Sequence, residues 1–418
     1  MLQAARTTAE GRLFRLLIGA LILVSAAAQF ALVPVMPVYA HRLGLSGFEQ
    51  GMVLGATGLA TLVVSVPAGT LADRFGARRI TLAAGLLMAA ATAAQALAGD
   101  FTVLFAARLA FGAGYGMVWT AGLCWLADAM AGGPPALGGS VASAGVGGVA
   151  GPAISGALAQ SLGLAVPLLV TAAIFAVITA GLAVLRVPPG PAAPYQAHTR
   201  GERPAAASRD LIGAGAAVVT AGLSTGVCAL LVPARLHAAG ASPGQIGLAF
   251  AAAGILFAVG SALTAAAGRR AVNLPVTCAG MLVLAAALSL AVVGTTPLPL
   301  VAMLCVTTAA RSVLWTVSYP LAASASANGG TGTGLGASVG LLNVIWAATA
   351  VLGPLGAGVA AAHLGAAAAF GLTEAVCAAA LAVTVALTWR GRRQARAVPG
   401  SSPTPQKGRT RSPSARPS

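Results

Sequence analysis

Three charged side chains lie inside long apolar stretches of this sequence, where a charge needs a specific reason. They are Arg108, Arg311 and Glu374. An arginine within a membrane span costs about 2.5–3.5 kcal/mol on insertion scales unless it meets a cavity or a partner. Such groups can bind an anion or transfer a proton inside a membrane, although Arg108 could instead reach water from near a helix end.

A second set of charges stands in the sequence GTLADRFGARR. The positions of interest are Gly69, Asp73, Arg74, Gly76, Arg78 and Arg79. Asp73 offers a carboxylate to helix N-termini or arginines, while Gly69 lets two helices approach and Gly76 permits a tight turn. Asp128, at the end of a later apolar stretch, could pair with Arg74 or Arg78 across a closed gate. The alternative is an ordinary positively charged loop.

The remaining polar residues do not form an enzyme's site. The sequence shows no paired acids, metal-ligand spacing or nucleophile constellation. Five cysteines lie within apolar stretches, at neither paired nor metal-type spacing, and we interpret them as packing residues. They are Cys124, Cys228, Cys278, Cys305 and Cys377. The sequence therefore predicts no enzymatic activity, no cofactor and no metal.

The composition requires lipid as the solvent for these side chains. Hydrophobic residues make up 58% of the 418 residues and charged residues 8%, which a water-soluble chain of this size could carry only by exposing large apolar patches. The apolar runs are continuous and much longer than a barrel strand of about 10 residues. We expect an all-α membrane protein. The net charge of +16 does not indicate nucleic-acid binding, because the basic residues lie between and after the apolar runs.

Division at charged, glycine, proline and asparagine clusters gives twelve expected spans. They lie near 13–39, 48–72, 80–98, 101–129, 137–162, 164–185, 210–235, 244–268, 273–294, 297–324, 334–360 and 364–389. The first run lacks a signal-peptide cleavage site and is interpreted as a span. The predicted domains are a cytoplasmic N-terminus (1–12), two six-helix bundles (13–185 and 210–389), a linker (186–209) and a disordered basic tail (390–418).

Positive charges predict the orientation of these spans. With the N-terminus inside, twenty basic residues fall on the inner side and only Arg42 and Arg235 fall outside. Lysine and arginine near helix ends are retained on the cytoplasmic side. Both termini are therefore expected in the cytoplasm, with the protein in the cell's inner membrane.

The two halves are repeats. The sequence PVYAHRLGLSGFEQG matches PARLHAAGASPGQIG, and the pairs are 196 residues apart, as in Pro37 with Pro233 and Gly51 with Gly247. Similar echoes link Arg108 to Arg311, and a Gly-Pro pair in the fifth span to one in the eleventh. Parallel repeats place a substrate site near the membrane midplane between the halves.

The GTLADRFGARR loop resembles the signature loop of the major facilitator superfamily. Ala77 stands where the family often has a basic residue, and the matching loop of the second half has Thr264 in place of the acid. The run RLAFGAGYG after Arg108 resembles a second motif of the family. The resemblance implies twelve helices in two parallel six-helix repeats that transport a solute by alternating access. Helices one, four, seven and ten would line its cavity.

The fifth span resembles a Gly-Pro motif associated with drug and proton antiporters of this superfamily. Its residues are Gly147, Gly151, Pro152 and Gly156, with Ser155 where a glycine is usual. Small residues and a proline-weakened backbone suit a helix that slides against a neighbour. Generic small-residue packing is the alternative.

The expected function is proton-coupled efflux of a small amphipathic compound, such as a drug or secondary metabolite. Candidate cavity residues are Arg108, Tyr115, Trp119, Arg311, Trp315, Tyr319 and Asn343; for each aromatic residue, helix packing or an interfacial belt is the alternative. Glu374 is the possible proton site. The runner-up is an organic-anion carrier that uses the two arginines, and a third class is a receptor or scaffold without transport. The expected partners are a small-molecule substrate, the proton and the lipid bilayer, with no nucleic acid and a monomeric chain.

Overall fold

The described part of the chain consists of helices joined by short turns and loops. The computed structural model describes the backbone of all residues except 1, 130–134, 186–208, 294–295, 328–334 and 398–418. Nearly all of the expected linker 186–209 and the tail beyond Ala397 thus lie outside the described residues. Within the described residues no strand occurs, which confirms the all-α prediction.

The helices follow the expected spans closely. In chain order they are α1 (Leu2–Ala31), α2 (Met36–Leu43), α3 (Gly47–Phe75), α4 (Ala77–Ala96), α5 (Phe101–Met117), the π-helical turn η1 (Val118–Gly122), α6 (Leu123–Ala129), α7 (Pro135–Leu162), α8 (Val166–Val184), α9 (Arg209–Ala238), α10 (Pro243–Ala267), the 3₁₀ turn η2 (Gly268–Arg270), α11 (Leu274–Val293), α12 (Pro297–Ala327), α13 (Leu335–Leu364) and α14 (Ala366–Ala397). Among the described residues, eleven stretches are long and apolar enough to cross a bilayer. The remaining expected span is α7, which packs between α1 and α10.

Two spans are not regular α-helices. The first, expected as one helix over 13–39, is divided into α1 and α2 by a turn that contains Pro34. Proline has no N–H to donate and its ring clashes with the preceding turn, so a break there is expected physically. The fourth span is continuous but widens into a single π-helical turn, η1, which carries Trp119. Such turns occur frequently at functional sites.

The outermost helices extend past the expected spans. The first begins at Leu2 rather than near residue 13, and the last ends at Ala397 rather than at Trp389. The structure therefore places residues 390–397 in a helix, where the sequence predicted a disordered tail from Arg390. Alanine, arginine and glutamine are good helix formers, so a helix that leaves the membrane can continue into water.

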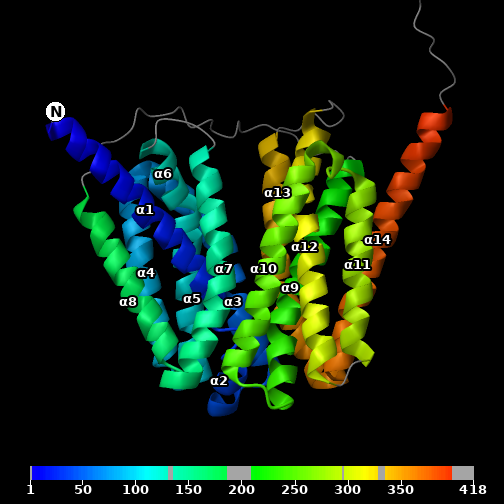
Figure 1. Ribbon diagram of the computed structural model, residues 1–418, viewed down its shortest axis with the longest axis horizontal. Coiled ribbons are helices and arrows are strands. Elements are labelled where there is room, and N and C mark those ends of the chain that lie inside the picture. The colour runs from blue at the N-terminus through cyan, green and yellow to red at the C-terminus, as the bar shows by residue number, and fades with distance from the viewer. Residues whose placement is uncertain (1, 130–134, 186–208, 294–295, 328–334, 398–418) are drawn as a thin grey trace, which may run out of the picture.

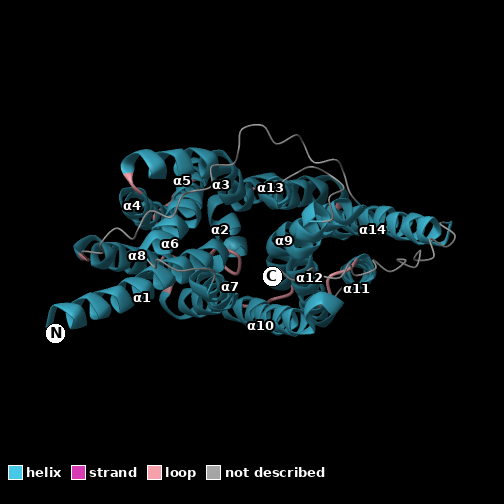
Figure 2. Ribbon diagram, turned by 90° about the horizontal axis from the view of Figure 1, so that it is seen from above, coloured by secondary structure: helices cyan, strands magenta, loops and turns pink. Residues whose placement is uncertain are grey.

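The helices form two bundles side by side, α1–α8 and α9–α14 (Figures 1 and 2). The N-terminus and the end of α14 lie at the same end of the molecule, which we call the termini end. The short helix α2 lies at the opposite end, which we call the α2 end (Figure 1). An even number of spans places both termini on one side, as the sequence predicts.

Among the described residues, the hydrophobic core is continuous between the bundles at the α2 end. One cluster of buried side chains joins Tyr39 and Val53 of the first bundle to Leu230 and Met303 of the second. Two further clusters each stay within one bundle: one contains Phe14 and its neighbours up to Leu185, and the other belongs entirely to the second half. The two bundles thus share packing at the α2 end and have separate cores toward the termini end.

Candidate functional site

Close glycine contacts hold the bundles together at the α2 end. A Cβ built on Gly51 of α3 would lie 2.5 Å from the carbonyl oxygen of Pro354 on α13. A Cβ on Gly247 of α10 would meet the carbonyl oxygen of Pro152 on α7. Both contacts cross between the bundles, and the sequence repeat relates them to each other. We call these two contacts the glycine closures.

Toward the termini end, the faces of α3 and α13 that pack on each other carry exposed side chains. Along α3, the face that packs on α13 continues to Leu62 and Val66, whose side chains are 37% and 77% exposed. Along α13, the corresponding face continues to Val344 and Leu341, which are 53% and 43% exposed. Residues three or four apart share one face of a helix. Among the described side chains, the bundles therefore pack together at the α2 end and stand open at the termini end.

The Gly-Pro residues of α7 make contacts within the first bundle and also across to the second bundle. A Cβ on Gly151 would lie 2.8 Å from the Cα of Ala27 on α1, within the first bundle, and Gly147 also packs on α1. Gly156 instead packs against Pro243 of α10, across the bundles. Ser155, which stands where the motif usually has a glycine, is buried and donates a hydrogen bond to the carbonyl of Ala31 (2.6 Å). The helix α7 thus packs closely on α1 of its own bundle and on α10 of the second bundle.

Arg108 is almost completely buried, with 1% of its surface exposed. Its Nη2 donates hydrogen bonds to the backbone carbonyl (2.6 Å) and the side-chain Oε1 (3.3 Å) of Gln29 on α1. The guanidinium also lies 5.0 Å from the ring centroid of Phe111. Arg108 therefore ties α5 to α1 and does not extend to water.

Arg311 occupies the equivalent place in the second bundle. It donates hydrogen bonds to Oγ1 of Thr225 on α9 (2.8 Å) and to Oγ1 of Thr308. Thr225 stands 196 residues after Gln29, so the repeat relates the two arginine contacts. Arg311 is only half-buried. The two arginines thus occupy equivalent positions in the repeat, but Arg108 is fully buried and Arg311 only partly.

Aromatic residues follow each arginine. In the first bundle the Tyr115 and Trp119 rings lie 5.9 Å apart. In the second, Trp315 lies 5.4 Å from Tyr319 and 4.6 Å from Trp346 of α13, measured between ring centroids. The Tyr319 hydroxyl donates a hydrogen bond to Oδ1 of Asn343 (2.9 Å). The structure thus brings the predicted cavity residues together as one cluster in each bundle.

The Gly69–Arg79 segment lies at the open, termini end, and it is not a loop as the sequence predicted: it is the end of α3 and the start of α4, with only Gly76 outside a helix. Gly76 has a φ of +90° and joins α3 to α4, a backbone conformation that favours glycine. Arg78 Nη2 donates to the carbonyls of Ala183 (2.6 Å) and Leu185 (3.2 Å) at the end of α8. Asp73 is exposed.

Other predicted gate residues are placed as follows. Gly69 faces the π-helical turn η1, because a Cβ built on it would lie 3.8 Å from Cγ2 of Thr120. Arg74 lies 5.4 Å from the ring of Phe75, and Arg79 is exposed. Asp128 belongs to α6, and its side chain is outside the described residues. The pairing of Asp128 with an arginine stays a prediction.

Glu374 lies apart from both clusters. Its Oε1 accepts a hydrogen bond from the Ser289 hydroxyl (2.8 Å), which joins α14 to α11. These two helices pack on each other at the side of the second bundle away from the first (Figure 2). A direct role at the interface between the bundles is therefore not supported by its position.

Three residues of the arginine clusters were missed from the sequence, namely Gln29, Thr225 and Trp346. The first two had a signal, because they are polar, lie in apolar spans and are separated by the same 196 residues as Pro37 and Pro233. Trp346 had no such signal, since a tryptophan in a membrane span is as well explained by packing.

Comparison with known proteins agrees with this architecture. The family model described as Major Facilitator Superfamily matches residues 18–337. The chain belongs to this superfamily and is a membrane transporter of small molecules. In fold it resembles a bacterial homolog of the human lysosomal transporter Spinster, in an inward-facing and unoccupied conformation (TM-score 0.74, 16% identity, 94% of this chain and 99% of that one). It also resembles the nucleoside transporter NupG, D323A mutant (TM-score 0.71, 12% identity, 90% and 99%).

Curated relatives match over short segments. The quinolone resistance protein NorA of Staphylococcus aureus is 35% identical over 86 residues, which is 21% of this chain and 22% of that protein. The arabinose-proton symporter of Bacillus subtilis (strain 168) is 35% identical over 99 residues, 24% of this chain and 21% of that protein. The matches thus span about a fifth of the length of these relatives.

Proposed function

We propose that the protein exports a small amphipathic organic compound, such as a drug or secondary metabolite, in exchange for protons. The observation that carries this proposal is the Gly-Pro helix α7, whose glycines fasten it to α1 while Gly156 packs on α10 across the bundles. A helix built this way can slide or separate from α10 without losing its own bundle. The local likeness to NorA supports a drug-like substrate.

The binding chamber in this proposal lies between the two aromatic clusters. Each cluster joins aromatic rings to a few polar groups, such as the Tyr319–Asn343 hydrogen bond. Sites for amphipathic molecules are mostly apolar with a small number of placed polar groups. The chamber would be accessible from the termini end in the described conformation.

The proposed orientation has the termini end in the cytoplasm. In the predicted topology, twenty of the 24 lysine and arginine residues are on the side of the termini and two on the other. This distribution supports cytoplasmic termini in the cell membrane. The described conformation would then be inward-facing, ready to receive a compound from the cytoplasm.

Transport into inverted membrane vesicles tests direction and coupling together. The expected result is uptake of a quinolone-type or other amphipathic compound that depends on an imposed proton gradient, acid inside. Collapse of the gradient with a protonophore should reduce the uptake to the level of vesicles without the protein. Equal uptake with and without the gradient would remove proton coupling, and transport only in right-side-out vesicles would remove export.

Replacing Asp73 with Asn is expected to reduce transport about tenfold or less while leaving the folded protein intact. The carboxylate is exposed while the termini end is open, so it stabilises little in this state, and it would gain helix termini or arginines as partners when that end closes. Such interactions contribute about 0.3–1 kcal/mol at exposed sites. Initial transport rates and thermal unfolding midpoints of both proteins measure the effect.

The matched control for this variant is Asp100→Asn at the α2 end. Asp100 caps α5 by accepting a hydrogen bond from Val103 N (2.9 Å), and asparagine caps a helix about as well as aspartate, so this variant should keep both its stability and its transport near those of the wild type. Wild-type transport kinetics for Asp73→Asn would remove the loop from the gate.

The second candidate function is carriage of an organic anion. It is favoured by the half-buried Arg311, whose guanidinium is bound only to hydroxyl groups among the described residues. It is weakened by the burial of Arg108, which is already bound to carbonyl oxygens. A receptor or scaffold that lacks transport would show no substrate movement in either vesicle orientation.

A further inference from the structure

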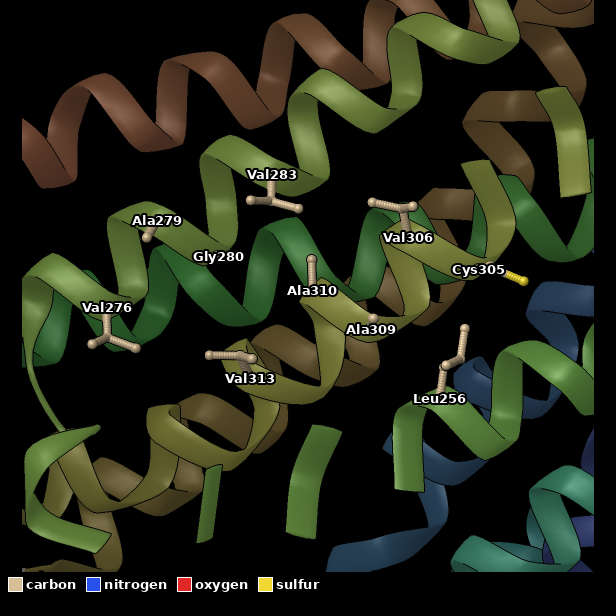
Figure 3. A pocket seen from close by; sticks show the side chains of 10 residues that line it. All are labelled: Leu256, Val276, Ala279, Gly280, Val283, Cys305, Val306, Ala309, Ala310 and Val313. Carbon is tan, nitrogen blue, oxygen red and sulfur yellow. The ribbon is translucent and has the colours of Figure 1, made fainter. Parts of the chain in front are cut away.

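A groove of about 440 Å³ opens on the side of the second bundle, between α10, α11 and α12 (Figure 3). Its lining is aliphatic apart from the Cys305 side chain. Space for it arises where the small residues Gly280 of α11 and Ala309 and Ala310 of α12 face each other. Three of its side chains are partly open to the surroundings: Leu256 is 40%, Val283 48% and Val306 40% exposed.

The position of the groove indicates an occupant with a hydrocarbon chain. Its walls belong to membrane spans, so its surroundings are lipid. On α11 it extends from Val276, near the start of the helix, to Val283, which is about 10 Å at 1.5 Å per residue. That length fits inside one leaflet of a hydrocarbon core of about 30 Å. On α11 the groove therefore lies in the leaflet next to the termini end, and on α12 it continues past the middle of the span to Cys305.

Two arginines stand at the membrane surface beside this leaflet. Arg269 and Arg270 form the turn η2, which joins α10 to α11, and both side chains are exposed. Asn273 fixes the turn to α11: it donates to the carbonyl of Arg270 (2.6 Å) and accepts from Val276 N (2.9 Å). Val276 itself lines the groove. The charged turn and the apolar groove are thus parts of one rigid corner.

The three helices that form this corner supply no acidic residue. No acidic residue occurs in the sequence between Asp210 and Glu374, so α10, α11 and α12 carry none. Glu374 is directed to Ser289 of α11, on a different helix pair. An anion from outside the chain would complement the two arginines, and a hydrocarbon chain attached to it would reach the groove.

We propose that this corner binds a phospholipid with an anionic headgroup, whose phosphate lies at Arg269 and Arg270 and whose acyl chain lies along Gly280, Ala309 and Ala310. Each basic residue near a membrane surface attracts anionic lipid, and the groove gives the bound lipid a fixed place. The site is separate from the chamber between the bundles, and it does not depend on the direction or coupling of transport.

Native mass spectrometry of the purified full-length protein tests this site with two lipids of matched chains, phosphatidylglycerol and phosphatidylcholine. The expected result is one phosphatidylglycerol retained about tenfold more than phosphatidylcholine. The double variant Arg269→Gln, Arg270→Gln should retain both lipids equally. The variants Ala279→Phe, at the exposed rim, and Ala309→Phe should lower retention of phosphatidylglycerol by filling the groove.

The matched control removes the same charge from the first bundle. Arg12 and Arg15 of α1 are exposed at the termini end, and Arg12→Gln, Arg15→Gln should retain phosphatidylglycerol like the wild type. Equal losses in both double variants would show attraction to surface charge only and overturn the site. Retention unchanged in both phenylalanine variants, together with altered drug transport, would assign the groove to substrate and also overturn the proposal.

Discussion

Replacing Gly51 with alanine is expected to shift the protein from the conformation closed at the α2 end toward one open there. The new Cβ would lie 2.5 Å from the carbonyl oxygen of Pro354 and 3.0 Å from its carbonyl carbon. These are backbone atoms and cannot rotate away. Overpacking of this kind costs about 1–3 kcal/mol, which corresponds to about a 5- to 150-fold change in an equilibrium. Because α3 and α13 belong to different bundles, separation of the bundles relieves the clash.

Spin labels can measure this shift. Cysteines introduced at Arg42 and His363 would report the separation of the bundles at the α2 end, in a chain whose native cysteines are replaced by alanine. Both positions are exposed there. The distance distribution should broaden to longer values in Gly51→Ala, and transport should fall because return to the closed state is disfavoured. Gly247→Ala, at the repeat-related closure, should act in the same direction.

The control substitution is Gly356→Ala, on the same helix as Pro354. A Cβ at this position has no atom within 4 Å, so helix propensity is the main change, and alanine favours the helix. Its distance distribution and transport should match those of the unmodified chain. If Gly51→Ala keeps the wild-type distances at equal thermal stability, the glycine closures do not set the conformational equilibrium.

The fold was largely predictable because lipid imposes a simple rule on sequence. Backbone polar groups must be satisfied within each span, so apolar runs of about 20 residues become helices. The one irregular span that separates into two helices is broken by Pro34, a residue visible in the sequence. The π-helical turn at Trp119 was not predictable, because it depends on how α5 packs against α3 and α4 and has no local signal.

The site was predictable only in part, because residue type does not tell where a side chain points. Arg108 and Arg311 look equivalent in sequence, and both stand next to their repeat-related partners Gln29 and Thr225. Only packing decides that Arg108 is fully buried and Arg311 partly buried. Glu374 was selected because it is the acid within a span, yet tertiary structure directs it to Ser289. The proposed roles in proton and substrate binding stay predictions.

Replacing each arginine with glutamine is expected to separate their roles. Arg108→Gln should lower the unfolding midpoint and transport together, because it leaves the buried carbonyl oxygens of Ala28 and Gln29 without their donor. A buried unsatisfied group costs about 1–3 kcal/mol. Lysine should not restore the protein, since an ammonium group lacks the planar fork that reaches two acceptors.

Arg311→Gln is expected to leave the unfolding midpoint nearly unchanged, because its acceptors are hydroxyl groups that can find other partners. The Thr225 hydroxyl already donates to the carbonyl of Ala221 (2.7 Å). Export of a cationic or neutral compound should then stay within about twofold of wild type, since a substitution that leaves the packing intact changes a free energy by about 0.5 kcal/mol or less. Organic-anion transport that is present in the wild type and lost in Arg311→Gln would instead favour the second candidate function, because a half-buried guanidinium is then the group that binds the substrate's charge.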